Sequence, residues 1–531
     1  MADQPKKLFV REATGLVREL GFVDHFFISS GIILVLGGFV ITALFTPLLF
    51  PGAYLPAVFL VGSIPAWAMA YIYGKLSAGI SRSGGDYVWS TRILGPLFGS
   101  VQFIFLLLAT ITFVGGGATQ IFFYGLAQFA FGVGVGTHSA SLLSLGGQLS
   151  SVGLGGPGSF LVLALVTIGA LVTLRAFGWI FRITYVFYYL LTIIFIIVVL
   201  TIVPSSVPAM FNNAMATAGV NVTYNSVIQS TSSSVPSQFS VSNTLLAAIP
   251  LGFTTFIGFN YGTYLAGETK NAKSSLSKAL YLAMAVTTIL LVAMSYMIYN
   301  AFGSTFLSSI AYYYGTNPGV LPVLPTASML AGLTSPYVAG VLGIGIAISW
   351  AVQIMGFLVT FSRIIFAASF DRLLPSAFSK VSDRFHAPYW AVILVSVLSG
   401  LYLFFFWYYG IIAAQLNTSY ILPIGFALPM IATLLFPVVK RDLYIRVFGS
   451  MAGARTLMFA SAVGAGAFIF YAIAISDPIV SGVYIGASLP LAIEVAVAGV
   501  LIGVGVYLWG HYHARRAGLD LNNIYAEIPP E

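Results

Sequence analysis

The sequence contains no cysteine, and only 7% of its 531 residues are charged. The absence of cysteine excludes disulfides, thiolate metal sites and thiol nucleophiles. The five histidines are scattered, and no phosphate-binding loop of the P-loop type is present. We therefore expect neither a metal centre, nor a bound cofactor, nor direct use of ATP, and an enzyme is not expected. With 59% hydrophobic residues, a soluble globular domain is excluded as well.

The sequence consists largely of long apolar runs, and its mean hydropathy is +0.98. The runs have the length of about 20 residues or more that crosses a hydrocarbon core of roughly 30 Å. We therefore predict an all-α polytopic membrane protein with twelve transmembrane helices. The predicted spans are 24–49, 54–80, 97–130, 158–177, 179–203, 243–267, 276–302, 336–369, 388–407, 411–438, 456–476 and 487–510.

Lysine and arginine are confined to the N-terminal segment, the C-terminal tail, and the connections and adjoining helix ends after the even-numbered spans up to the tenth. By the positive-inside rule these segments face the cytoplasm. Both termini therefore lie on the cytoplasmic side of the cell membrane, and the number of crossings is even. The net charge of +8 therefore lies beside the lipid bilayer, and no nucleic acid partner is expected.

The connection between the fifth and sixth spans, residues 204–242, is rich in serine, threonine, asparagine and valine and is predicted to be a polar external loop. Asn221 in this loop and Asn417 in the tenth span each begin an Asn-x-Ser/Thr triplet, the acceptor pattern for N-glycosylation. Such triplets also arise by chance, so an unmodified asparagine is an equal alternative at both positions.

Spans 1 and 6 share an irregularity near their midpoints. Span 1 has Gly37 and Gly38 there, and span 6 has Gly258 and Asn260. Interrupted helices in corresponding positions of two five-helix halves indicate an inverted-repeat transporter with a site at the bilayer midplane. The alternative is close packing of helices through small residues, which is common in membranes.

Three further stretches resemble one family. They are "SRSGGDYVWSTRILGP" after span 2, "GETKNAKSSLSKAL" after span 6 and "SRIIFAASFDRLLPSAFSKVSDRFHAPYWAV" after span 8. In this order and at these spacings they closely resemble the signatures of the amino acid–polyamine–organocation (APC) superfamily. The resemblance covers roughly residues 15–440.

The resemblance implies a LeuT-type fold in which two five-helix repeats are inverted relative to each other. The first repeat would be 24–203 and the second 243–438, joined by the external loop 204–242. Two accessory helices would lie in 439–510, between cytoplasmic segments 1–23 and 511–531.

The resemblance also implies that the unwound middles of spans 1 and 6 hold the substrate, with Phe256 as an aromatic lid. The family has a Gly-Ser-Gly element in span 1. By its position along the chain this element corresponds to Gly37-Gly38-Phe39, whereas Ser30-Gly31-Ile32 is more similar to it in residue type. Uncharged groups of span 8 would add a substrate or sodium contact. The candidate substrate-binding residues are Ser30, Gly31, Gly37, Gly38, Phe39, Thr254, Thr255, Phe256, Ile257, Gly258, Asn260 and Gln353.

Charged residues beside the same spans are candidates for a cytoplasmic gate. Asp86 is expected to join an ion-pair cluster with Arg82 and Arg92, and Glu268 to act at a hinge after span 6; a solvated loop is the alternative. Span 5 lacks the lysine that substitutes for sodium in some relatives, so the coupling ion, H⁺ or Na⁺, stays open. Glu494 is the one carboxylate clearly inside the membrane, and we expect it to serve an oligomer contact or a helix–helix hydrogen bond.

The predicted function is secondary active transport of amino acids, and neutral zwitterions are favoured because no charged side chain lies in the midplane parts of spans 1, 3, 6 and 8. Transport of other organic amines or polyamines, or amino acid exchange, is an alternative. A channel is a remote alternative, because no selectivity-filter motif is visible. A homo-oligomer is possible.

Overall fold

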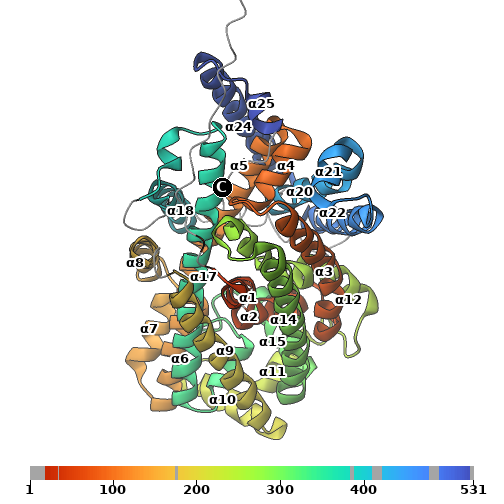
Figure 1. The fold of residues 1–531 in the computed structure, drawn as a ribbon. Helices are drawn as coiled ribbons and strands as arrows, with labels where there is room; N and C mark the ends of the chain where they lie inside the picture. Colours follow the sequence, from red (N-terminus) through yellow and green to blue (C-terminus); the bar gives the residue numbers. More distant parts are fainter. Residues whose placement is uncertain are drawn as a thin grey trace, which may run out of the picture.

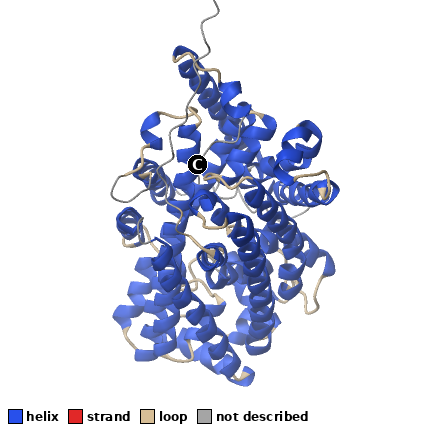
Figure 2. Cartoon of the chain, viewed as in Figure 1, coloured by secondary structure: helices blue, strands red, loops and turns tan. Residues whose placement is uncertain are grey.

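The computed structural model of the chain describes residues 18, 20–33, 35–173, 177–382, 388–409, 421–476 and 489–526. Within these residues every regular element is a helix, and the long helices pack side by side without any strand (Figures 1 and 2). The predicted all-α polytopic fold is confirmed. This is the architecture expected in lipid, because a helix satisfies its own backbone groups.

Among the described residues, eleven helical stretches are long and apolar enough to cross a bilayer, and the shorter apolar helix α8 lies where the fourth span was predicted. Together they follow the twelve predicted spans in order. They are α1 (Phe22–Ile32) with α2 (Val35–Leu49), α3 (Leu55–Gly79), α5 (Pro96–Gln120) with η1 (Ile121–Leu126) and α6 (Ala127–Thr137), α8 (Gly155–Thr173), α9 (Phe177–Thr201), α12 (Val241–Ala247) with η3 (Ala248–Phe253), α13 (Thr254–Phe256) and η4 (Phe259–Glu268), α14 (Ala272–Phe302), α17 (Pro336–Phe370), α18 (Tyr389–Tyr409), α20 (Ile421–Val439), α22 (Ala454–Ser476) and α24 (Leu489–Arg516).

The short helices gather at the two ends of the bundle (Figure 1). At one end lie α4 (Gly85–Leu94), α21 (Arg441–Phe448) and α25 (Leu521–Ala526). We call this the basic end, because α4, α21 and the last turn of α24 carry arginine. At the opposite, uncharged end lie α7 (Ala140–Leu149), α10 (Val207–Thr217) and α11 (Tyr224–Thr231). The remaining short helices are η2 (Pro204–Ser206), α15 (Ser304–Thr316), α16 (Ala327–Gly332) and η5 (Ser376–Ser379).

The predicted external loop 204–242 is more ordered than its composition indicates, because it contains η2, α10 and α11. Its polar side chains satisfy the helix ends. The N–H of Ser226 donates to Thr223 Oγ1 at 3.2 Å, and the N–H of Tyr224 donates to Asn212 Oδ1 at 2.7 Å. Phe211 is fully buried beneath this polar layer. Serine, threonine and asparagine therefore act here as helix caps.

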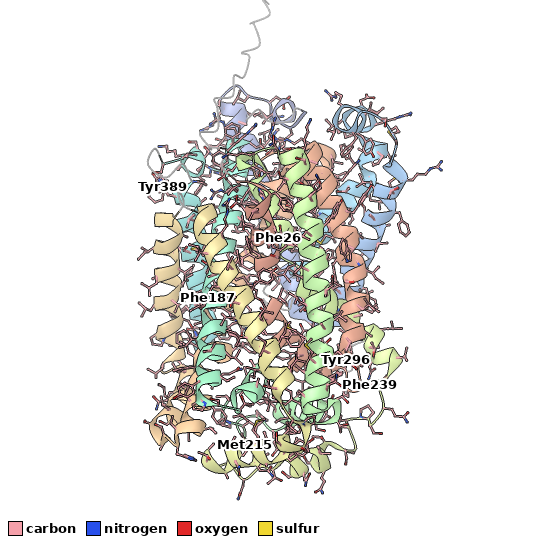
Figure 3. All side chains as sticks on the ribbon, turned by 60° about the horizontal axis from the view of Figure 1, so that its bottom comes forward. Phe26, Phe187, Met215, Phe239, Tyr296 and Tyr389 are labelled. Atoms are coloured by element: carbon pink, nitrogen blue, oxygen red, sulfur yellow. The ribbon has the colours of Figure 1, made fainter. Side chains whose placement is uncertain are left out.

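The outer face of the bundle is apolar. Phe187 of α9 and Tyr296 of α14 lie on it, and Ile289 is 68% exposed (Figure 3). In the same view Met215 lies at the uncharged end and Tyr389 toward the basic end. A continuous apolar surface of this kind is stable against lipid and not against water. Most of the polar side chains at the site described below are, in contrast, buried between the helices.

Candidate functional site

Span 6 is interrupted at Ile257 and Gly258. Helix α13 ends at Phe256, Ile257 is extended, and Gly258 has a φ of 131° before the 3-10 helix η4 begins at Phe259. This φ lies in the region that favours glycine, because a side chain would clash with the backbone. Gly258 therefore allows the chain to leave one helix and enter the next in the interior of the protein.

In span 1, helix α1 ends at Ile32 and helix α2 begins at Val35; of the two residues between them, Ile33 lies in a turn and Leu34 lies outside the described residues. The two candidate stretches flank this point: Gly31 lies in the last turn of α1, and Gly37 lies in the first turn of α2. The interruption thus coincides with neither stretch. Gly31 instead allows a helix contact, since a Cβ added there would lie 1.8 Å from the ring of Tyr185.

The two interruptions face each other. A Cβ added at Gly258 would lie 3.0 Å from the carbonyl oxygen of Ile32. The same oxygen accepts a hydrogen bond from Gln353 Nε2 of α17 at 2.8 Å. Just beyond, the hydroxyls of Thr42 and Thr255 are 2.6 Å apart and link α2 to α13. Residues far apart in the sequence therefore bring two interrupted helices into one site.

Span 5 contributes a residue that sequence reasoning missed. The N–H of Leu36, in the first turn of α2, donates to the hydroxyl of Tyr188 in α9. The first N–H groups of a helix have no partner within it, and Tyr188 supplies one. The only sequence signal was that tyrosines are the sole ionisable groups in residues 183–203.

The other predicted binding residues of span 1 and α13 pack or bond locally. Ser30 Oγ donates to the carbonyl of Phe26, and the hydroxyl of Thr254 donates to the carbonyl of Pro250. Phe39 is fully buried, with its ring 6.0 Å from Phe59. Phe256 is fully buried and Ile257 is 8% exposed. Gly38 is partly buried, and a Cβ added there would lie 3.2 Å from the carbonyl oxygen of Ile33 and 3.3 Å from Thr255.

Asn260 links the interruption of span 6 to the basic end. Its Oδ1 accepts from the N–H of Gly258 at 3.4 Å, and its Nδ2 donates to the hydroxyl of Tyr264 at 3.4 Å. The hydroxyl of Tyr264 in turn donates to Asp86 Oδ2 at 3.0 Å, and the hydroxyl of Tyr73 donates to the same oxygen at 2.5 Å. Asp86 thus bonds to tyrosines, and it does not form the expected cluster with Arg92.

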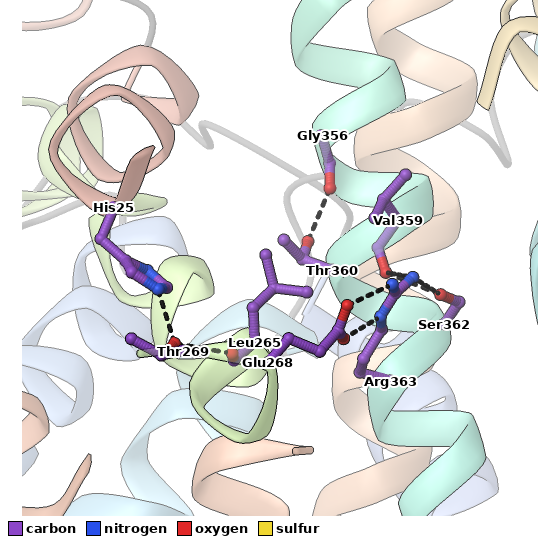
Figure 4. Close-up of polar contacts among 9 residues, drawn as sticks. All are labelled: His25, Leu265, Glu268, Thr269, Gly356, Val359, Thr360, Ser362 and Arg363. Atoms are coloured by element: carbon purple, nitrogen blue, oxygen red, sulfur yellow. Dashed lines mark hydrogen bonds and ion pairs between the residues drawn. The ribbon is translucent and has the colours of Figure 1, made fainter. Parts of the chain in front are cut away.

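The predicted gate residues otherwise form separate ion pairs. Arg92 binds both carboxylate oxygens of Asp371, at 2.5 and 2.7 Å, where α17 ends. Glu268 binds Arg363 of α17 through two hydrogen bonds of 2.8 and 2.9 Å (Figure 4). Arg82 lines an open cavity of about 430 Å³.

One more ion pair and one histidine contact tie α1 to its neighbours. Arg182 of α9 binds Asp24 at 2.5 Å. His25 Nε2 lies 2.6 Å from the hydroxyl of Thr269, directly after η4 (Figure 4). Asp24 and His25 are buried between the helices, whereas the side chain of Arg182 is 47% exposed. A buried carboxylate is normally stable only with such a partner.

The electrostatics of Asp86 differ from those of the paired acids. Asp86 lies in α4, outside the spanning helices, and is fully buried. Burial raises the pKa of its carboxyl from 3.8 to about 7, and the hydrogen bonds from Tyr73 and Tyr264 oppose this rise because they favour the charged form.

Residues 20–506 match the family described as amino acid permease. The chain belongs to this family. It is therefore a member of the APC superfamily, as the three sequence motifs predicted, and a multi-pass membrane transporter.

Three proteins are similar in sequence to parts of this permease. It is 28% identical to a branched-chain amino acid permease of Bacillus subtilis over 397 residues, 73% of this chain and 74% of the relative. It is 24% identical to a methylthioribose transporter of the same organism over 387 residues, 71% of this chain and 73% of the relative. A shorter match of 163 residues at 28% identity, 31% of this chain and 25% of the relative, is to the vacuolar cationic amino acid transporter 4 of Arabidopsis thaliana.

The remaining candidate residues of the permease lie away from the facing interruptions. Asn221 is exposed between α10 and α11, and Asn417 lies outside the described residues. Glu494 is exposed on α24. No group of three His, Cys, Asp or Glu side chains that could hold a metal ion occurs in the described part of the chain.

Proposed function

We propose that this permease is a secondary active transporter that moves neutral, zwitterionic amino acids across the cell membrane by alternating access, with both termini in the cytoplasm. The observation that carries the proposal is the approach of Gly258 to the carbonyl of Ile32. Interrupted helices expose N–H groups that can bind a carboxylate and carbonyls that can bind an ammonium group. A zwitterion presents both.

The surroundings of the facing interruptions support a neutral substrate. The described side chains that bond there, Gln353, Thr42, Thr255, Asn260 and Tyr188, are polar but carry no formal charge. A diamine would leave a cation without a buried acid beside it, and a dicarboxylate would leave an anion without a base, and both are costly. The name of the similar permease from Bacillus subtilis refers to branched-chain amino acids, which are neutral, and this agrees with the proposal.

Uptake into proteoliposomes tests the proposal. The purified permease is reconstituted with internal unlabelled leucine, and the entry of labelled leucine by counterflow is measured. We expect saturable entry that isoleucine and valine inhibit and that lysine, glutamate, spermidine and methylthioribose do not. Inhibition by one of the latter group alone would contradict the neutral amino acid assignment, and entry that does not saturate would indicate a channel.

A further inference from the structure

The turn before α4 places a carboxyl group against the second half of span 6. Gly84 and Gly85 both have positive φ, of 99° and 48°. A Cβ added at Gly85 would lie 2.3 Å from the ring of Tyr264, and the N–H of Gly84 donates to the carbonyl of Tyr264 at 3.1 Å. Only glycine permits this approach, and it brings Asp86, the next residue, to the hydroxyl of Tyr264.

Asp86 is buried in a place built for a carboxyl group but without a cation. Oδ2 accepts from the hydroxyls of Tyr73 and Tyr264. Oδ1, also buried, has no partner at hydrogen-bond geometry among the described residues, although the N–H groups of Asp86 and Tyr87 at the start of α4 favour the charged carboxyl. A buried ion is normally paired or neutralised. Here the unpaired Oδ1 leaves room for a proton, and the two hydroxyls with the first turn of α4 keep the ionised form accessible.

The arginines near Asp86 form ion pairs with other acids. The helices that pack on α4 are α3, α5, α17, α20, α25 and η4. Arg363 of α17 pairs with Glu268 of η4, and Arg92 of α4 pairs with Asp371. Lys75, the cation of α3, lies over the ring of Phe448. Helices α5 and α20 contain no titratable residue. The titratable and charged groups on α4 and on the other packing helices near this site are Tyr73, Tyr87, Arg92, Tyr261, Tyr264, Glu268, Arg363 and Tyr525.

An open cavity borders the connection that carries Asp86. Ser81 and Arg82, which precede the glycine turn, line the open cavity of about 430 Å³ at the basic end, together with Lys273. Asp86 itself is fully buried behind this connection and does not line the cavity.

We propose that Asp86 is the proton-binding site of this transporter and that Tyr264 and Asn260 relay its occupancy to the interruption of span 6. The proposal rests on the proposed transport function and names H⁺ as the coupling ion. In the ionised state the N–H of Gly258 donates to Asn260, Asn260 donates to Tyr264, and Tyr264 donates to Asp86.

Protonation changes the end of this chain. A proton from water forms an O–H bond on the carboxylate and removes its negative charge; on release the same bond breaks and the proton returns to water. Hydrogen bonds to a charged acceptor are roughly twice as strong as neutral ones, so Tyr264 is held less firmly when Asp86 is neutral. Because Tyr264 belongs to η4, protonation loosens the second half of span 6 from α4.

Substrate acts on the other end of the same chain. A carboxylate that binds the N–H of Gly258 replaces Asn260 Oδ1, whose hydrogen bond of 3.4 Å is long and easily exchanged. Once its oxygen is released, the side chain of Asn260 can move, and its hydrogen bond to the hydroxyl of Tyr264 becomes weaker. Since coupling between two sites is reciprocal, leucine binding shifts the proton affinity of Asp86, and protonation shifts the affinity for leucine.

Infrared difference spectroscopy of the reconstituted permease tests proton binding directly. Between about pH 5 and about pH 9 we expect a carboxylic acid band that disappears with a midpoint near neutrality and that is absent in Asp86→Asn. The matched control is Asp442→Asn, because Asp442 also lies in the first turn of a short helix at the basic end but is exposed. Persistence of the band in Asp86→Asn would overturn the proposal.

Leucine transport tests the coupling. A gradient of one pH unit can drive about tenfold accumulation by one proton per substrate. We expect this accumulation in the wild type and in Asp442→Asn, and none in Asp86→Asn, which still exchanges leucine by counterflow. Accumulation by Asp86→Asn equal to that of the wild type would overturn the proposal.

Tyr264→Phe tests the relay while leaving the carboxyl in place. Loss of a donor to the ionised form raises the midpoint of the Asp86 band, and we expect the leucine-induced shift of that midpoint to disappear. An unchanged shift in Tyr264→Phe would refute the relay. If the wild type moves no leucine, the proposed function fails, while the infrared titration still decides whether Asp86 binds the proton.

Discussion

The two interrupted helices of this permease are built differently. In span 6 the interruption is set by the chain itself, because Gly258 adopts a φ of 131°. In span 1 it lies between the end of α1 at Ile32 and the start of α2 at Val35. Here side chains of other helices bind the free backbone groups: Gln353 of α17 donates to the carbonyl of Ile32, and the hydroxyl of Tyr188 in α9 accepts from the N–H of Leu36. One interruption is therefore encoded locally and the other by tertiary contacts.

This difference separates two kinds of substitution. A change at Gly258 alters the backbone itself, so its effect should be large. A change at Gln353 or Tyr188 leaves the backbone of span 1 intact and removes one hydrogen bond, so its effect should be smaller.

The largest effect is expected for Gly258→Val. The side chain would require a φ unfavourable by about 1–3 kcal/mol and would press on the carbonyl of Ile32. We expect leucine affinity to fall at least about tenfold while the protein remains inserted and folded. Binding is measured by thermal shift with leucine. Gly319→Val is the matched control, since Gly319 has a φ of 82° but no atom within 4 Å of an added Cβ. Equal affinities of the two variants would contradict a site at Gly258.

Gln353→Leu is expected to have an intermediate effect. It leaves the buried carbonyl of Ile32 without its side-chain partner, at a cost of about 1–3 kcal/mol. Leucine counterflow should weaken about tenfold. Gln102→Leu is the control: Gln102 is also buried, but neither its oxygen nor its nitrogen has a partner among the described residues, so stability should be unchanged or improved. A Gln353→Leu variant that behaves like Gln102→Leu would show that the Ile32 contact has no role.

Tyr188→Phe should have the smallest effect. The ring stays in place and only the acceptor for the N–H of Leu36 is lost, which costs about 1 kcal/mol and corresponds to about a fivefold change in affinity. Tyr444→Phe is a suitable control, because the hydroxyl of Tyr444 is buried without a hydrogen-bond partner in the described structure. Thermal unfolding and leucine affinity are measured for both variants, and we expect the unfolding temperature and the affinity to fall for Tyr188→Phe alone.

The same difference explains what could be predicted from the sequence. The order of the spans was predictable, because length and apolarity are local properties of each run. The interruption at Gly258 has a local signal, a glycine among apolar residues. Gln353 and Tyr188 have none that fixes their partners, since these lie 321 and 152 residues away in the sequence.

Charge pairing was the least predictable feature. Nearness in sequence placed Asp86 with Arg92, whereas the fold gives Arg92 a partner 279 residues away and gives Asp86 two tyrosine hydroxyls. Helices α10 and α11 were missed for a related reason. Serine, threonine and asparagine are typical of loops, and they become helix caps only when residues such as Phe211 find a buried place.

The central claim is that the two facing interruptions hold the substrate. Electron cryo-microscopy of the permease in lipid nanodiscs with saturating leucine tests it most directly. We predict density for leucine between the carbonyl of Ile32 and the N–H of Gly258, absent without leucine and absent in Gly258→Val. Leucine density elsewhere in the bundle, with Gly258 still packed against Ile32, would contradict the account.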